Sequence, residues 1–134
     1  MIDPFVGTWS LDTSENFDEY LKEVGVNALK RGVATASSPD VVISKADDGF
    51  ISMKAGNIMT PHKIKFKLNE EFDETTIDGR KARVSYCIIN NGKLVQKQSW
   101  DGKTTTLVRE IKEGKLRVEC TMGDVTSVRV YKKK

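Results

Sequence analysis

Three side chains near the end of the chain could together hold an anion: Arg109, Arg129 and Tyr131. Guanidinium groups and a phenol donate charge-assisted hydrogen bonds to carboxylates and phosphates. Because residues two apart on a strand share a face, Arg129 and Tyr131 would point the same way, and Arg109 would lie on the face of Leu107 and Ile111. Two readings stay open at this level: an anion site inside a barrel, or arginines that face water, where most charged side chains lie.

The segments that carry these residues are predicted to be the last three strands of an all-β protein. They cover residues 104–111, 116–122 and 125–131, with glycine-containing turns between them. Upstream, similar short strands are predicted over residues 41–46, 50–55, 63–68, 71–76, 81–89 and 93–100. Many short strands with regular turn signals are typical of an antiparallel barrel or sandwich.

The N-terminal part is predicted to form one strand, over residues 5–11, followed by two helices. Apolar residues recur at helical spacing: Phe17, Tyr20, Leu21 and Val24. Asn16 and Glu19 fit the N-cap and N3 positions of a capping box, and Gly25 fits the end of the helix. A second, shorter helix is predicted over residues 27–34, ending before Pro39.

Two amides appear on a face that should otherwise be apolar. Gln96 and Gln98 share a strand face with Leu94 and Trp100. If that face looks inward, a solid core would leave the amides without hydrogen-bond partners. A cavity that holds water and a polar-headed ligand would satisfy them, which favours a ligand-binding barrel.

Composition narrows the class of protein. The 134 residues fit one domain, 1–134, and a net charge of +3 is too small and too scattered to indicate nucleic-acid binding. The N-terminus carries no export signal, so Cys87 and Cys120 are expected to be free thiols in the cytoplasm. A single histidine, His62, makes no metal site. We expect a monomer, because nothing indicates otherwise.

The chain resembles the intracellular fatty-acid-binding proteins, most closely the heart, adipocyte and myelin branch. The resemblance rests on motifs spread over essentially the whole chain. They are Gly7-Thr8-Trp9-Ser10-Leu11, Asn16-Phe17-Asp18-Glu19-Tyr20-Leu21, Glu71-Phe72-Asp73-Glu74-Thr75-Thr76, Trp100-Asp101-Gly102, Thr106-Leu107-Val108-Arg109-Glu110 and Arg129-Val130-Tyr131.

The resemblance implies a ten-stranded antiparallel up-and-down barrel with a two-helix lid, carrying a long-chain fatty acid. Arg129 and Tyr131 would bind the carboxylate, and Arg109 would act largely through water. Phe17 matches a family aromatic near the ligand chain. Met59 would lie at the portal, where relatives often carry phenylalanine. No cofactor, metal or catalytic residue is implied.

Alternatives and partners complete the sequence-based expectations. A retinoic-acid carrier is the nearest alternative, since those relatives share the Arg-x-Tyr ending. An enzyme acting on lipid would need a nucleophile or base, and the two cysteines have no histidine near them in sequence. Basic residues of the helical region, Lys22, Lys30 and Arg31, could contact anionic membranes, and nuclear import is left open. Pro61 and His62 depart from the closest relatives.

Overall fold

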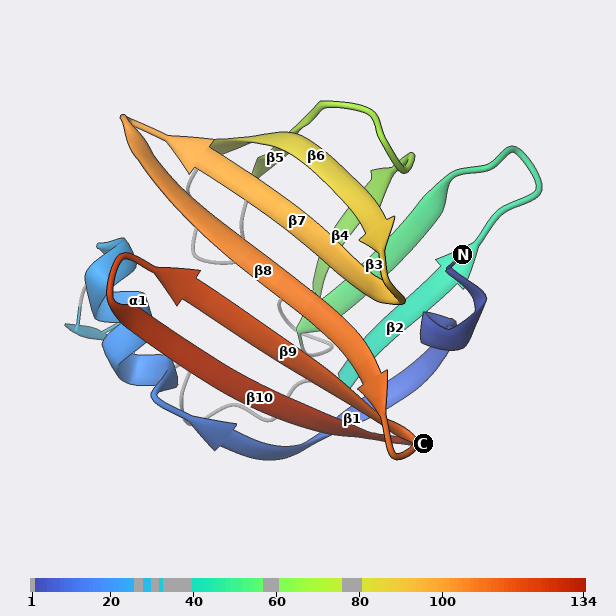
Figure 1. Ribbon diagram of the computed structural model, residues 1–134, viewed down its shortest axis with the longest axis horizontal. Helices are drawn as coiled ribbons and strands as arrows, with labels where there is room; N and C mark the ends of the chain where they lie inside the picture. The colour runs from blue at the N-terminus through green and yellow to red at the C-terminus, as the bar shows by residue number, and fades with distance from the viewer. Residues whose placement is uncertain (1, 26–27, 30–31, 33–39, 57–60, 76–80) are drawn as a thin grey trace.

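A single antiparallel sheet of ten strands curls into a nearly closed barrel (Figure 1). The computed structural model describes residues 2–25, 28–29, 32, 40–56, 61–75 and 81–134. The strands are β1 (Gly7–Glu15), β2 (Asp40–Lys45), β3 (Ile51–Gly56), β4 (Pro61–Phe66), β5 (Phe72–Thr75), β6 (Lys81–Asn90), β7 (Lys93–Trp100), β8 (Lys103–Lys112), β9 (Lys115–Met122) and β10 (Val125–Lys133). The predicted all-β class is therefore confirmed.

The topology is up-and-down. Each strand pairs with its neighbour in sequence, and β1 pairs with β10, giving the order β4-β3-β2-β1-β10-β9-β8-β7-β6-β5. The two ends of this order, β4 and β5, are not hydrogen-bonded to each other. Side chains bridge them instead, because Phe66 on β4 stacks on Phe72 with ring centroids 5.3 Å apart and planes 10° from parallel. Pro61 begins β4, which is an edge strand, the place in a sheet where proline is tolerated.

The first predicted helix is present as α1 (Phe17–Val24), at one end of the barrel (Figure 1). Its apolar stripe is buried against β9 and β10, and Gly25 ends it with φ 106°. The predicted capping box is wrong. Asn16 adopts a left-handed conformation without a side-chain cap, and its Nδ2 donates to the carbonyl of Thr126 at 3.3 Å.

The second predicted helix, residues 27–34, lies largely outside the described residues. Ala28, Leu29 and Gly32 are helical where they are described. No helix in the described part of the chain is long and apolar enough to cross a membrane.

The predicted first strand, residues 5–11, differs from the observed β1 at both ends. A 3-10 turn, η1 (Asp3–Phe5), has Pro4 in its first turn and occupies the predicted start of the strand. Phe5 is buried, and its carbonyl accepts the Trp9 indole N–H at 2.9 Å. β1 then runs on to Glu15, with a bulge between Leu11 and Thr13. A bulge breaks the period of two, which is why alternation failed to predict the second half of this strand.

The inner face of the sheet changes character along the barrel axis. Near η1 it is tightly packed, with Phe5, Trp9, Ile43, Ile51 and Phe66 all buried. Further along, inward-facing apolar residues keep part of their surface accessible; these are Leu107, Met122 and Val125. Partial accessibility of inward-facing side chains is what the lining of a hollow shows, and a close-packed core would bury them.

Candidate functional site

The strand register places both candidate arginines on one row of the sheet. On β9, Val118 pairs with Arg109 of β8 on one side and with Arg129 of β10 on the other. Directly opposed residues of antiparallel strands project to the same face. Val118 is buried, so this face is the inner one, and the reading in which both arginines face water is wrong.

Arg129 is buried, with 7% of its surface exposed. Its guanidinium lies over the Phe17 ring, with Cζ 3.9 Å from the ring centroid. Its Nε has no hydrogen-bond partner among the residues that the structure describes. A buried guanidinium with an unmatched donor is costly. The ring attracts the cation through its face but leaves the edge donors for an anion.

Tyr131 lies two residues further along β10 and is also buried. Burial raises the pKa of its phenol, although Arg129 acts in the opposite direction. Burial likewise raises the pKa of the Cys120 thiol to about 11, against the lowering effect of Arg109 and Arg129. At neutral pH both groups are therefore protonated. Tyr131 can donate a hydrogen bond, and Cys120 lacks the thiolate character of a nucleophile.

Arg109 is half-buried and belongs to a chain of hydrogen bonds. Its Nη1 donates to Gln96 Oε1 at 2.7 Å. The other end of the same amide, Gln96 Nε2, donates to Glu74 Oε1 at 3.0 Å, and Gln98 Nε2 donates to that oxygen at 2.9 Å. Gln96 and Gln98 therefore lie on the inner face and are buried. The partners of these amides are protein side chains, so their presence does not by itself require a cavity filled with water.

Glu74 is a member of the site that sequence reasoning did not single out. The signal was available, because Glu74 lies two residues after Phe72 on a short strand and therefore shares its inward face. From the sequence, residues 71–76 are predicted to form a strand and to carry a family motif, without a role for Glu74. Glu74 is brought to Gln96 and Gln98 by the pairing of β5 with β6 and of β6 with β7.

Phe17 is placed at the boundary between α1 and the inner face. It is partly buried, lies under Arg129, and stacks on Tyr20 with ring centroids 6.3 Å apart. Tyr20 in turn shares a 2.7 Å hydrogen bond with Thr105 of β8. The helix is therefore anchored to the barrel beside the arginine row.

The remaining predicted residues are Lys22, whose side chain the structure describes, and a group whose side chains it does not describe. Lys22 is exposed on α1. Met59, Lys30 and Arg31 lie outside the described residues, as do the side chains of Cys87, Pro61 and His62.

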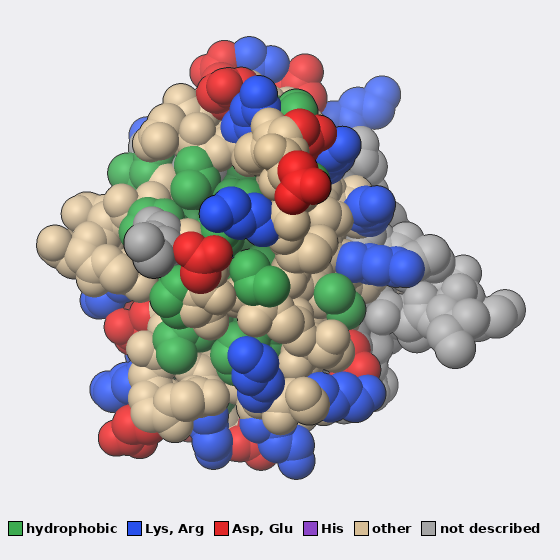
Figure 2. All heavy atoms as spheres, turned by 90° about the vertical axis from the view of Figure 1, so that its right-hand side faces the viewer, with side chains coloured by type: hydrophobic (Ala, Val, Ile, Leu, Met, Phe, Trp, Pro, Cys, Tyr) green, Lys and Arg blue, Asp and Glu red, His purple; other side chains and the backbone are tan. Residues whose placement is uncertain are grey.

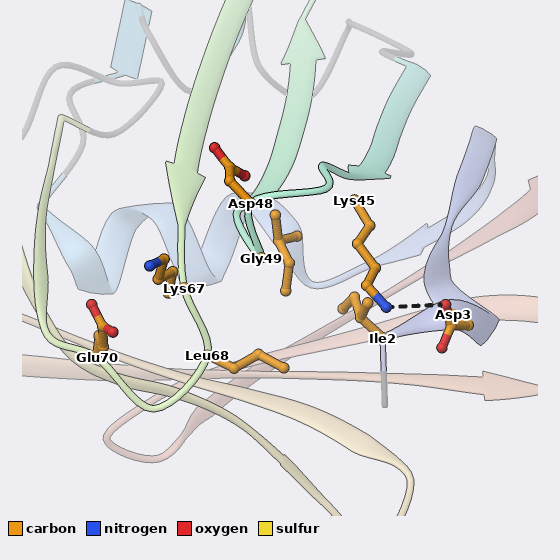
Figure 3. A pocket seen from close by; sticks show the side chains of 9 residues that line it. Ile2, Asp3, Lys45, Asp48, Gly49, Lys67, Leu68 and Glu70 are labelled. Carbon is orange, nitrogen blue, oxygen red and sulfur yellow. Dashed lines mark ion pairs between the residues drawn. The ribbon is translucent and has the colours of Figure 1, made fainter.

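A separate hollow of about 500 Å³ lies at the η1 end of the barrel (Figure 3). It is bounded by η1, the β2–β3 turn and the β4–β5 connection, and Lys45 reaches across to Asp3 at 3.7 Å. Figure 2 shows this end of the molecule, where charged side chains lie around and among the hydrophobic ones. Its charged residues have both signs, and it does not contain the arginines, so it is distinct from the candidate site.

Comparison with known proteins decides the family. Residues 6–134 match the model of the lipocalin / cytosolic fatty-acid binding protein family. The chain belongs to this family. Human fatty acid-binding protein 9 is 44% identical to it over 133 residues, covering 99% of each chain.

Solved structures of related proteins share the fold closely. The fluorescent protein UnaG is 43% identical, with a TM-score of 0.92 and full coverage of both chains. The fatty acid binding protein of Schistosoma mansoni, solved in complex with arachidonic acid, is 33% identical, with a TM-score of 0.92 and coverage of 99% and 98%. The fatty-acid-binding family and its barrel, expected from the sequence motifs, are thereby confirmed.

Proposed function

We propose that this protein is a non-enzymatic carrier that binds one long-chain fatty acid inside the barrel. The carboxylate accepts hydrogen bonds from Arg129 and Tyr131, while Arg109 contributes mainly at longer range, through water. The observation that carries the proposal is the buried Arg129, whose Nε has no partner among the described residues. A ligand carboxylate supplies the missing acceptor and a counter-charge. The arachidonic-acid complex of the Schistosoma mansoni relative supports this ligand class.

The acyl chain provides most of the binding free energy. Each methylene moved from water to an apolar lining contributes about 0.8 kcal/mol, so fourteen methylenes contribute roughly 11 kcal/mol before the costs of association and ordering. The partly accessible Leu107, Met122 and Val125 offer such a lining. The headgroup site then fixes orientation and the class of ligand.

Catalysis is not part of the proposal. Cys120 is buried with a raised pKa, and Tyr131 is held neutral by burial. Neither is a nucleophile at neutral pH. The positively charged groups on the inner face fit binding of an anion without its chemical conversion.

Displacement of a bound fluorescent fatty-acid probe tests the function. We expect oleate and palmitate to displace the probe at submicromolar concentrations, with oleyl alcohol and all-trans-retinoic acid weaker. Stronger displacement by retinoic acid would mean that the protein carries a retinoid, with its carboxylate bound by the same three residues. Failure of all four ligands would overturn the carrier proposal.

A further inference from the structure

Glu74 is the acidic side chain that the described strands place on the inner face together with the two arginines. Its neighbour Phe72, two residues earlier, stacks on Phe66 of the core, which shows the direction of this face. The carboxylate accepts two hydrogen bonds from buried amides, at 2.9 and 3.0 Å. Glu74 is half-buried, so its carboxylate gives up part of its hydration at this position.

The hydrogen-bond chain connects Glu74 to one arginine and not to the other. Gln96 lies between Arg109 and Glu74, and its amide dipole has the orientation that stabilises both charges, with oxygen toward the cation and nitrogen toward the anion. Arg129 has an aromatic ring beside it instead, and no described carboxylate is paired with it. One internal cation is therefore compensated and the other is not.

We infer that Glu74 sets the charge class of the ligand by acting as the internal counter-ion of Arg109. Around the arginine row, the two arginines and Glu74 together carry a net charge of one positive unit, which matches a single carboxylate. Gln96 and Gln98 are positioning residues in this arrangement. The inference rests on the proposed function, because it concerns the ligand held at the same arginine row.

The physical consequence is selection against headgroups with two negative charges. The second charge of a dianion would enter the barrel without a partner, at an effective dielectric constant well below that of water. Removing the charge of Glu74 should improve binding of any anion, and the gain in free energy should be twice as large for a dianion. A neutral ligand should not respond.

Dodecyl sulfate and dodecyl phosphate provide a matched pair for the test. Both headgroups are tetrahedral, but at pH 8 the sulfate carries one charge and the phosphate, with a second pKa of about 6, carries nearly two. Probe displacement is measured for both ligands, below their micelle concentrations, and for dodecanol. In Glu74→Gln we expect about tenfold tighter sulfate binding and about a hundredfold tighter phosphate binding, with dodecanol unchanged.

Two further variants separate charge compensation from general damage. Asp73→Asn removes a carboxylate from the outward face of the same strand, where it pairs with Arg83, and should leave the phosphate-to-sulfate ratio unchanged. Adding Arg109→Gln to Glu74→Gln restores one net positive charge and should return the ratio to the wild-type value. Glu74→Ala serves where Glu74→Gln does not fold, and should shift the ratio in the same direction.

The outcomes distinguish this inference from the proposed function. If palmitate displaces the probe but Glu74→Gln leaves the phosphate-to-sulfate ratio unchanged, the role of Glu74 is overturned and the carrier proposal stands. A shift of equal size in Asp73→Asn would also overturn it, because the effect would then be one of net charge. If palmitate fails to displace the probe from the wild-type protein, the proposed function falls and this inference falls with it.

Discussion

Arg109 and Arg129 occupy equivalent positions on either side of Val118, yet their surroundings differ. Arg109 donates to the Gln96 amide, whereas Arg129 lies against the Phe17 ring with an unmatched Nε among the described residues. Two cations on one row of a buried face repel each other unless their charges are compensated. The hydrogen-bond chain through Gln96 links Arg109 to the carboxylate of Glu74, whereas no described carboxylate is paired with Arg129. This difference leads to different predictions for the two positions.

Arg129→Gln should separate headgroup binding from chain binding. The variant loses the charge-assisted hydrogen bond to the carboxylate but keeps the lining of the barrel, so oleate affinity should fall roughly ten- to a hundredfold. Oleyl alcohol, which has the same chain, should change by less than about threefold. Probe displacement by the two ligands measures the difference. An equal loss for both would mean that the substitution disturbs the barrel and that Arg129 does not hold the headgroup.

Phe17→Leu should lower the stability of the unliganded protein, because it removes the contact between the Phe17 ring and the Arg129 guanidinium. A cation over an aromatic face contributes about 1–2 kcal/mol when it is desolvated. The free energy of unfolding, measured in urea, should fall by about that amount, and Phe17→Tyr should restore most of it. In the double variant with Arg129→Gln, the effects of the two substitutions on the free energy of unfolding should not add. Strict additivity would show that Phe17 only fills space.

The stability of the protein should fall as the pH rises above about 9. An unfolded Cys120 thiol ionises near pH 9.0, while burial keeps the folded thiol protonated up to about pH 11. Between these values the folded state binds more protons, so each pH unit costs about 1.4 kcal/mol of stability. Burial of Tyr131 acts in the same direction at higher pH, because its pKa is raised as well.

Urea unfolding at pH 8 and pH 10.5 measures this dependence on pH. Cys120→Val removes the thiol while keeping an apolar side chain of similar size, and it should flatten the decline between these two values. The same decline in wild type and in Cys120→Val would assign the effect to other groups.

Lys22→Glu should slow delivery of fatty acid to anionic membranes. Lys22 is exposed on α1, so its charge is free to attract a surface of acidic lipids. Transfer of a fluorescent fatty acid to phosphatidylglycerol vesicles should slow several-fold, with affinity unchanged. Lys112→Glu, at the exposed end of β8, is the control with the same change in charge. Equal transfer rates for wild type and Lys22→Glu would contradict the prediction that α1 contacts anionic membranes.

The sequence by itself determined which residues share a face. A period of two assigned Arg129 and Tyr131 to one face and grouped Gln96 and Gln98 with Leu94. Turn residues, in most of the connections including a glycine, determined the number of strands after residue 40, and the 3.6-residue period located α1 within its observed bounds. These features are local, because they follow from backbone geometry over a few residues.

Tertiary structure decided which face is inside and which residues meet across the sheet. Whether Arg129 faces water or a cavity depends on how the whole sheet curls. The contact of Glu74 with Gln96 depends on the register of two successive strand pairs. At Asn16 a distant contact replaces the N-cap that the local sequence predicts. The Asn16 side chain donates to the carbonyl of Thr126, and α1 has no side-chain cap. Such contacts join residues far apart in the chain, and no short-range pattern encodes their geometry.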